Sequence, residues 1–469
     1  MSLVERSAVD LAAAIRSREV SCAEVMAAFL DRIEAANPTI NAIVSLRPRD
    51  ELMAEAHEAD EGEPGGPLHG LPFAIKDLAN TAGITTTFGS PALAANVPRR
   101  DDLIAARIRE AGAIVVGKTN TPEFGFGSHT TNPVFGPTRN PYDTALTPGG
   151  SSGGAAAALA CRMLPVADGS DMMGSLRNPA AWCNVYGLRP TPGTVPNDAM
   201  GTVREGLGDL LATCGPMGRS PADMALLMDV IAQSDPRQPN NLSRPASWAD
   251  ALNGDVSLRI GWLGDWGLPF EPGVLAFCRD GVAPLADIGC TLDEARPAIG
   301  LEDAWFAWTA LRANASRARL QPFVTQFGVD ALGRNARHEW DWVYGIDLQE
   351  VRQCMDKRNA LIAELDRLFE TFDVLVLPSA QRFPFPAEWD YPRETAGVEA
   401  DTYHRWMEVV VPVSLSGVPA VALPVGFNDD GLPMGVQVFT RRGEDAKLMR
   451  LAARWHEATG WPEKRPPPL

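Results

Sequence analysis

The chain has 469 residues, with 42 Lys and Arg against 59 Asp and Glu, so its formal net charge is −17 at pH 7. Hydrophobic types make up 45% of it and charged types 22%, as in ordinary folded globular proteins. The acidic balance argues against a broad nucleic-acid interface or a polybasic membrane patch. No apolar stretch approaches the roughly 20 residues of a bilayer-spanning helix, and no apolar signal-peptide core is seen near Met1.

The cysteines and histidines give no sign of a disulfide framework or a metal site. The seven cysteines are scattered and never spaced C-x-x-C, and the six histidines lack a ligand spacing such as H-E-x-x-H. We therefore expect a cytoplasmic protein with no disulfides and no metal or other cofactor.

Helix-end signals appear early in the chain. Ser21 and Glu24 form a capping box, and the Asn-Pro pair at 37–38 is expected to end the helix that follows. Asp101 is expected to cap a second helix, which Gly112 would end.

Apolar runs and amphipathic periodicity predict alternating strands and helices along the rest of the chain. The predicted strands cover 71–75, 113–116, 256–263, 373–377, 420–425 and 434–439. Further helices are predicted after Ser220-Pro221 and over 348–372 and 444–459. A long polar segment over 117–154 has no element of its own, which is typical of functional segments. The alternation indicates an α/β protein whose sheet is covered on both faces, in one domain spanning 1–469.

Two motif matches fail a physical test. Residues 112–119 satisfy the P-loop pattern G-x-x-x-x-G-K-[ST], but their interior is strand-like rather than a flexible phosphate-binding loop. Residues 150–154 satisfy the nucleophile-elbow pattern G-x-S-x-G around Ser152, but no apolar strand precedes them. Histidines downstream leave a Ser–Asp–His enzyme open as a minor alternative.

A third constellation needs no histidine. The run Gly-Gly-Ser-Ser-Gly-Gly at 149–154 leads into a helix of small residues, and Ser175 lies 24 positions beyond Ser151 (175 − 151). Lys76 ends the apolar strand predicted over 71–75. Burial disfavours the charged ammonium, so an interior lysine can act as a base near neutral pH. Two serines and one lysine therefore suffice for nucleophilic acyl transfer.

At these residues the sequence resembles the amidase signature family. The lysine-bearing strand, the Gly/Ser-rich segment and the second serine occur in the family's order and spacing. Further similar segments lie at 84–90, 117–124, 140–141, 186–190, 215–220, 417–420 and 431–435. The resemblance runs nearly end to end, with its signature core at about 65–220. It implies an α/β fold with a large mixed β-sheet sandwiched between layers of α-helices.

The resemblance also implies a role for each matching residue. Ser175 matches the nucleophile, Lys76 the base, and Ser151 the bridging serine, which follows a cis peptide bond after Gly150. An acyl-enzyme would form on Ser175 and be hydrolysed by water. Gly125 is expected near the acyl carbon of the substrate. The expected oxyanion hole consists of backbone N–H groups of Met172, Met173, Gly174 and Ser175.

The chain departs from the family pattern at three positions. The family usually has glycine where this chain has Met173, and a small or β-branched residue where it has Met172. A positive φ at 173 would be costly for methionine, and the two thioethers either line the pocket or fill the core. Ser414 stands where the family often has asparagine, with no predicted consequence.

Five other features have a structural and a functional interpretation. Ser152 is expected to support its neighbours, Arg177 to pair with Asp171 rather than with a substrate carboxylate, and His129 to be a hydrogen-bonded loop residue rather than a leaving-group contact. Asp77 is expected to orient the local backbone. Aromatic residues between 305 and 344 either pack in the core or at an interface between protomers, or form the wall of an aryl pocket.

We therefore predict an amidohydrolase that cleaves the C–N bond of a small-molecule carboxamide, with esters, aryl amides or carbamates as related substrates. The main alternative is the glutamine-hydrolysing subunit of a tRNA-dependent amidotransferase, and a third option is a non-catalytic binding protein. No nucleic-acid or membrane partner is predicted, and a homodimer is left open.

Overall fold

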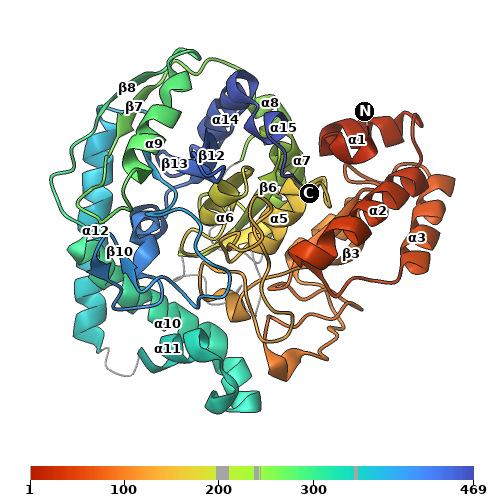
Figure 1. Ribbon diagram of the computed structural model, residues 1–469, viewed down its shortest axis with the longest axis horizontal. Helices are drawn as coiled ribbons and strands as arrows, with labels where there is room; N and C mark the ends of the chain where they lie inside the picture. The colour runs from red at the N-terminus through yellow and green to blue at the C-terminus, as the bar shows by residue number, and fades with distance from the viewer. Residues whose placement is uncertain (1, 197–210, 237–241, 243, 343–346, 469) are drawn as a thin grey trace.

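An eight-stranded mixed β-sheet forms the centre of the fold in this computed structural model, which describes residues 2–196, 211–236, 242, 244–342 and 347–468 (Figure 1). The strand order is β4-β6-β5-β12-β13-β9-β7-β8. Neighbouring strands are antiparallel, except that β7 pairs in parallel with β8 and β9. The strands are β4 (Val166–Asp171), β5 (Tyr186–Arg189), β6 (Thr213–Gly218), β7 (Arg259–Trp262), β8 (Thr291–Glu294), β9 (Val374–Pro378), β12 (Ala420–Phe427) and β13 (Pro433–Phe439).

Helices cover the central strands on both faces. Every residue of β9 and of β13 is buried, which requires protein on each side of the sheet. The longer helices are α1 (Ala8–Arg16), α2 (Cys22–Ile40), α3 (Arg49–Glu61), α4 (Leu103–Glu110), α5 (Gly153–Ala160), α7 (Pro221–Ile231), α9 (Val274–Gly281), α10 (Glu302–Phe327), α11 (Arg334–Trp342), α12 (Leu348–Phe369) and α14 (Asp445–Thr459). The short ones are α6 (Arg177–Trp182), α8 (Trp248–Ala251), α13 (Val411–Ser416) and α15 (Trp461–Lys464). The predicted α/β sheet between helical layers is confirmed.

A separate three-stranded sheet carries the predicted catalytic lysine. Its order is β1 (Ile43–Val44), β3 (Ile114–Thr119) and β2 (Pro72–Lys76), with β2 and β3 parallel. Lys76 is the last residue of β2, so its side chain leaves the sheet at the strand end. In Figure 1 this part of the chain lies with α2 and α3 to one side of the large sheet.

The buried helix α5 follows directly from the Gly/Ser-rich segment. All eight of its residues are buried, and most are alanine. At Gly154 an added Cβ would lie 2.4 Å from the backbone nitrogen of Asn120, so only glycine lets the helix start approach the end of β3 so closely.

The element predictions hold except at two helix ends and in the polar segment 117–154, where β3 continues to Thr119 and a short 3-10 helix covers Glu123–Gly125. The Ser21–Glu24 capping box is present, but α2 continues through Pro38 to Ile40. It ends at Asn41, whose φ is +55°, and the side-chain oxygen of Asn37 accepts the backbone N–H groups of Ala42 and Ile43. A proline this close to the end of a helix disrupts few of its hydrogen bonds.

The cap predicted at Asp101 is also wrong. Asp102 occupies the N-cap position of α4, and Asp101 instead accepts the backbone N–H of Ala82 at 2.6 Å. Both aspartates thus bind the loop that follows β2.

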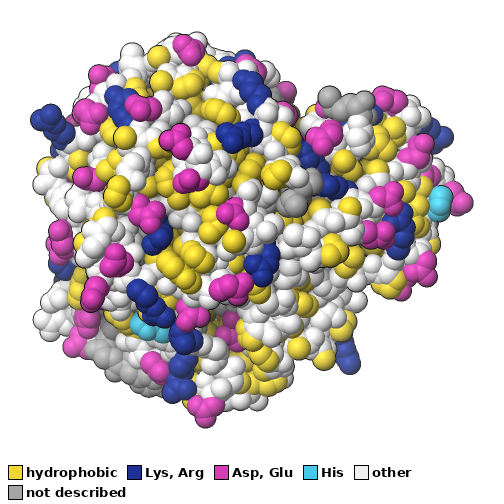
Figure 2. All heavy atoms as spheres, viewed as in Figure 1, with side chains coloured by type: hydrophobic (Ala, Val, Ile, Leu, Met, Phe, Trp, Pro, Cys, Tyr) yellow, Lys and Arg dark blue, Asp and Glu magenta, His cyan; other side chains and the backbone are white. Residues whose placement is uncertain are grey.

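The surface carries both signs of charge. On the face in Figure 2, acidic and basic side chains are interspersed over much of the surface. In the described part of the chain, no helix combines the length and apolar character needed to cross a membrane.

Candidate active site

Three serine hydroxyls surround the buried amine of Lys76. The Lys76 side chain is only 2% exposed, and its Nζ lies 2.8 Å from Ser151 Oγ, 2.8 Å from Ser152 Oγ and 3.0 Å from Ser170 Oγ. The backbone N–H of Lys76 donates to Asp168 Oδ1 at 3.0 Å. The strand end, the Gly/Ser-rich segment and β4 therefore meet at one amine.

Burial changes the chemistry of this amine. Desolvation lowers the pKa of Lys76 from 10.5 to about 7, although the nearby charge of Asp168 raises it. Near neutral pH, a large fraction of the side chain is therefore uncharged. A neutral amine has two N–H donors and one lone pair, so one of its three hydroxyl neighbours must donate a hydrogen bond to Nζ.

The Gly/Ser-rich segment is held in an unusual backbone conformation. The predicted cis peptide bond between Gly150 and Ser151 is present, and Ser128 Oγ donates to the Gly150 carbonyl at 2.5 Å. The backbone N–H of Ser152 donates to the Ser175 carbonyl at 3.3 Å. Its Oγ accepts the N–H of Ser170 at 3.3 Å as well as Lys76 Nζ. Ser152 is fully buried, in agreement with the predicted supporting role.

Ser175 and Ser151 face the same small cavity, of about 40 Å³. Among the residues that the structure describes, no hydrogen bond joins their two hydroxyls. The wall combines apolar and polar side chains, and its other members are Leu78, Phe124, Gly125, Phe126, Gly127, Ser170, Met172, Met173, Ala212, Thr213, Arg312, Arg319 and Met407.

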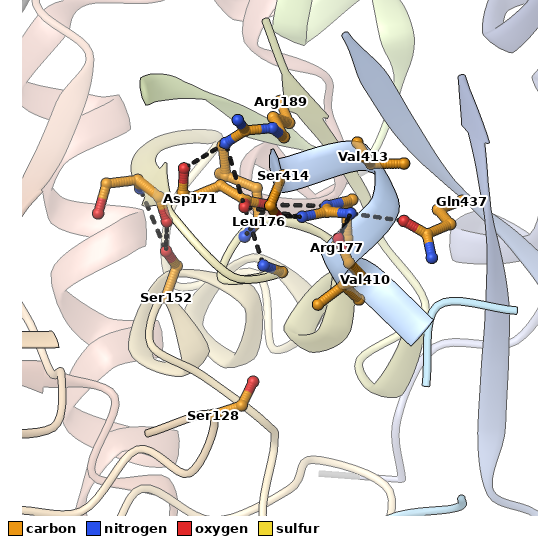
Figure 3. A network of polar contacts seen from close by, with 12 residues as sticks. Ser128, Ser152, Asp171, Leu176, Arg177, Arg189, Val410, Val413, Ser414 and Gln437 are labelled. Atoms are coloured by element: carbon orange, nitrogen blue, oxygen red, sulfur yellow. Dashed lines mark hydrogen bonds and ion pairs between the residues drawn. The ribbon is translucent and has the colours of Figure 1, made fainter. Parts of the chain in front are cut away.

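A buried ion pair anchors the loop that contains Ser175 (Figure 3). Arg177 Nε lies 2.9 Å from Asp171 Oδ2, and its Nη2 lies 3.0 Å from Oδ1, which confirms the predicted pairing. Burial would raise the pKa of Asp171, but Arg177 and Arg189 outweigh it and lower the pKa to about 2. The same carboxylate accepts the N–H groups of Gly174 and Leu176, so it fixes the backbone on both sides of Ser175.

The ion pair also explains Ser414, whose role the sequence left open. Arg177 Nη2 donates to Ser414 Oγ at 2.7 Å, and its Nη1 donates to Gln437 Oε1 at 2.5 Å. Ser414 is therefore a partner of Arg177, from a segment distant in the sequence.

The methionine pair fits its backbone without strain. The positive φ in this loop, +80°, falls on Gly174, and neither methionine has a positive φ. Both thioether side chains line the cavity and also pack against the core. The two interpretations of Met172 and Met173 therefore both apply.

The N–H of Gly174 differs from its predicted role in an oxyanion hole. It donates to Asp171 Oδ1 at 2.9 Å, and the residue is not on the cavity wall. Within the described residues, the N–H groups of Met172, Met173 and Ser175 make no hydrogen bond. Gly125 is on the cavity wall with a φ of +79°, and a Cβ added there would lie 3.5 Å from Ser151 Oγ.

The other predicted features lie away from the cavity. His129 is hydrogen-bonded between Thr147 and the Ala387 carbonyl, and burial lowers its pKa to about 4. Asp77 accepts the N–H and the hydroxyl of Thr87. The expected structural roles of both residues are thus observed.

The P-loop match is a strand, as predicted. Lys118 lies in β3 and is buried, and its Nζ donates to the Ala79 carbonyl and to Thr81 Oγ1, each at 2.6 Å. In the aromatic cluster, Trp305, Trp308 and Trp340 are buried and do not line the cavity, whereas Tyr344 lies outside the described residues.

Sequence reasoning missed Ser170 and two arginines of the cavity. Ser170 and Asp168 are two positions apart in β4, so strand alternation directs both to one face, and this signal was available. Arg312 and Arg319 come from α10, in a stretch without a recognisable motif.

Comparisons of the sequence and of the structure with known proteins point to one family. The family model described as Amidase matches residues 24–449. The chain is 36% identical to an acylamidase of Rhodococcus erythropolis, over 98% of this chain and 97% of that protein. It is also 35% identical to a subunit of the glutamyl-tRNA(Gln) amidotransferase of Thermus thermophilus, over 96% of both chains.

Solved structures match over nearly the whole chain. The crystal structure of a bacterial aryl acylamidase of the amidase signature family superposes with a TM-score of 0.90, at 28% identity over 98% of this chain and 99% of the other. A peptide amidase matches with a TM-score of 0.79, at 27% identity over 99% of both chains. The chain therefore belongs to the amidase signature family and is an amide-hydrolysing enzyme.

Proposed function

We propose that this protein hydrolyses carboxamides through an acyl-enzyme on Ser175, with Ser151 and Lys76 as its proton relay. The observation that supports this proposal most directly is the 2.8 Å contact between Lys76 Nζ and Ser151 Oγ, in an environment that lowers the pKa of Lys76 to about 7. An amine that is partly neutral at physiological pH can accept a proton from a serine, as an imidazole does elsewhere.

The first half of the reaction transfers the acyl group. Ser175 Oγ forms a bond to the carbonyl carbon while its proton passes to Ser151 Oγ, and the proton of Ser151 passes to Lys76 Nζ. The tetrahedral intermediate then breaks its C–N bond, and the same relay returns a proton to the departing amine. In the second half, water attacks the ester carbonyl through the relay, and the acid and the free Ser175 are released.

Backbone N–H groups stabilise the negative oxygen of this intermediate in the proposed mechanism. Because the N–H of Gly174 is occupied by Asp171, we assign the donors to Met172, Met173 and Ser175. Each correctly placed donor contributes about 3–4 kcal/mol to transition-state stabilisation in enzymes of this type.

The wall of the cavity favours an amide with an apolar acyl or aryl part. Two phenylalanines and three methionines line it: Phe124, Phe126, Met172, Met173 and Met407. The similarity to an acylamidase and an aryl acylamidase supports the same substrate class.

Glutamine hydrolysis within an amidotransferase is the second candidate. The 35% identity to one subunit of such an enzyme favours it, and the chemistry at the serine would be the same. Purification of the chain together with partner proteins would support this candidate, whereas turnover of simple amides by the isolated chain would support the first.

Covalent labelling tests the proposed mechanism. A fluorophosphonate probe is expected to modify Ser175, and peptide mapping should show the label disappear in Ser175→Ala and weaken in Lys76→Ala. A label on Ser152 would contradict the proposal and favour the nucleophile-elbow interpretation.

We also propose a cytoplasmic location, supported by seven cysteines that are all buried and free. The homodimer stays a prediction, which light scattering on the purified protein would test.

A further inference from the structure

Helix α10 brings two arginines to the wall of the active-site cavity. Arg312 and Arg319 are seven residues apart, about two helical turns, so they lie on the same face of the helix. Arg312 has partners for its charge: its Nε lies 3.0 Å from Glu339 Oε1, and its Nη2 lies 2.5 Å from the Tyr403 hydroxyl. Its guanidinium is therefore part of the protein's own buried network.

The surroundings of Arg319 are different. Within the described residues, no carboxylate, hydrogen bond or aromatic ring engages its guanidinium, although the residue is half-buried and lines the cavity with Ser175. Its positive charge is near enough to Lys76 to help lower the pKa of that amine. A partly desolvated cation is unfavourable without a counter-charge, and none of the residues that the structure describes supplies one to Arg319, so this part of the cavity wall can accept an anionic group of a ligand.

We infer that Arg319 binds a carboxylate of the substrate, so that the preferred substrates are amides that also carry an acidic group. This inference rests on the proposed function, because it assigns the missing charge to the molecule that Ser175 attacks. The planar guanidinium matches the two oxygens of a carboxylate, and such charge-assisted pairs are stronger than neutral hydrogen bonds. The carboxylate can belong to the acyl half or to the amine half of the amide.

Two matched substrate pairs test the inference and separate these two origins. Succinic acid monoanilide and its methyl ester differ only in a charge on the acyl half. 4-Acetamidobenzoate and its methyl ester differ only in a charge on the amine half. We expect the wild-type enzyme to favour the acid over the ester in one of the pairs by roughly 10- to 100-fold in kcat/KM.

Variants of Arg319 test whether its guanidinium causes the acid-to-ester ratio, which is kcat/KM for the acid divided by kcat/KM for its methyl ester. Arg319→Gln is expected to bring the acid-to-ester ratio close to one, and Arg319→Lys to retain part of it. The ratio is insensitive to a general loss of activity or to a shifted pKa of Lys76, because both substrates of a pair experience the same change. Arg317→Gln is the matched control: Arg317 is on the same helix, stacks on Trp340 at 4.3 Å, is not on the cavity wall, and should keep the wild-type ratio.

Binding to Ser175→Ala, measured by calorimetry, separates this inference from the proposed mechanism. Tighter binding of one acid than of its ester, lost when Arg319→Gln is added, supports the inference even if none of the four amides is hydrolysed by the wild type. Equal binding of acid and ester in both pairs overturns it, even if both esters are hydrolysed. A preference that survives Arg319→Gln also overturns it, and a shifted pH profile with an unchanged ratio would reduce Arg319 to a neighbour that tunes Lys76.

Discussion

The role of Lys76 as the base predicts an activity that falls as the pH is lowered through about 7. Burial lowers the pKa of this lysine from 10.5 to about 7, so the neutral amine predominates above pH 7 and disappears below it. Two pH units below the pKa, only about 1% of the amine is neutral, and kcat/KM should be about 100-fold below its plateau. The plateau is expected above about pH 8.

A charge-removing variant tests whether the surroundings of Lys76 set the midpoint of this pH profile, the pH at which kcat/KM is half of its plateau value. Asp168 raises the pKa of Lys76 through its negative charge, and its Oδ1 accepts the backbone N–H of Lys76 at 3.0 Å. Asp168→Asn retains an acceptor oxygen but removes the charge, so the midpoint should move to lower pH by about one unit. Asp77→Asn is the matched control: Asp77 is also a buried aspartate, but its side chain binds Thr87, and this variant should leave the midpoint in place.

The assay is kcat/KM for an uncharged anilide from pH 5 to 10, since this parameter reports groups of the free enzyme. Circular dichroism at each pH separates titration from unfolding. The buried histidine of the polar segment, His129, has a pKa of about 4 and is not expected to contribute in this range. A profile that is flat from pH 5 to 9, or a midpoint that rises in Asp168→Asn, would refute the reasoning.

Three further substitutions probe the framework of the site. Ser152→Ala removes one hydroxyl from the amine and should lower kcat by about five- to tenfold while labelling of the nucleophile persists, as peptide mapping would show. In a urea titration, Gly174→Ala should destabilise the protein by more than about 2 kcal/mol, because the φ of Gly174 is +80° and the new Cβ would lie 2.1 Å from a side-chain amide. Gly83→Ala is the control: Gly83 has a φ of +74° but no atom within 4 Å of the new Cβ, so this variant should cost only about 1 kcal/mol. Arg177→Met leaves the buried Asp171 with Arg189 as its remaining ion-pair partner, and a loss of about 3–5 kcal/mol is expected in urea unfolding; a loss below 1 kcal/mol would contradict an anchoring role.

The elements that could be predicted are those with a local signal. An apolar run ending in lysine predicts β2 and its buried amine, and the glycine-rich run at 149–154 predicts a backbone that other residues do not allow. The pairing of Arg177 with Asp171 follows from their presence in one short loop. For each of these features, the determining residues are close together in the sequence.

The features that escaped prediction depend on contacts between distant segments. The role of Ser414 exists only because α13 lies next to Arg177, and nothing near position 414 indicates it. Arg319 reaches the cavity because α10 packs beside it, although a helical arginine is ordinarily solvent-exposed. The division of the predicted strands between the three-stranded and the eight-stranded sheet is equally non-local, since β2 and β3 look like members of any α/β sheet.

The position of Asp168 shows how the fold keeps a lysine basic at neutral pH. Lowering the pKa of a buried lysine from 10.5 to about 7 corresponds to a folding cost on the order of 5 kcal/mol below pH 7, which decreases as the pH rises toward 10.5, because the unfolded chain binds more protons in that interval. A carboxylate in direct contact with Nζ would remove this cost and also restore the ammonium. Asp168 instead binds the backbone N–H of Lys76, and only neutral hydroxyls contact the amine among the described residues. The site therefore accepts a loss of stability comparable to the net stability of a small domain, because a neutral amine is what the proposed relay requires.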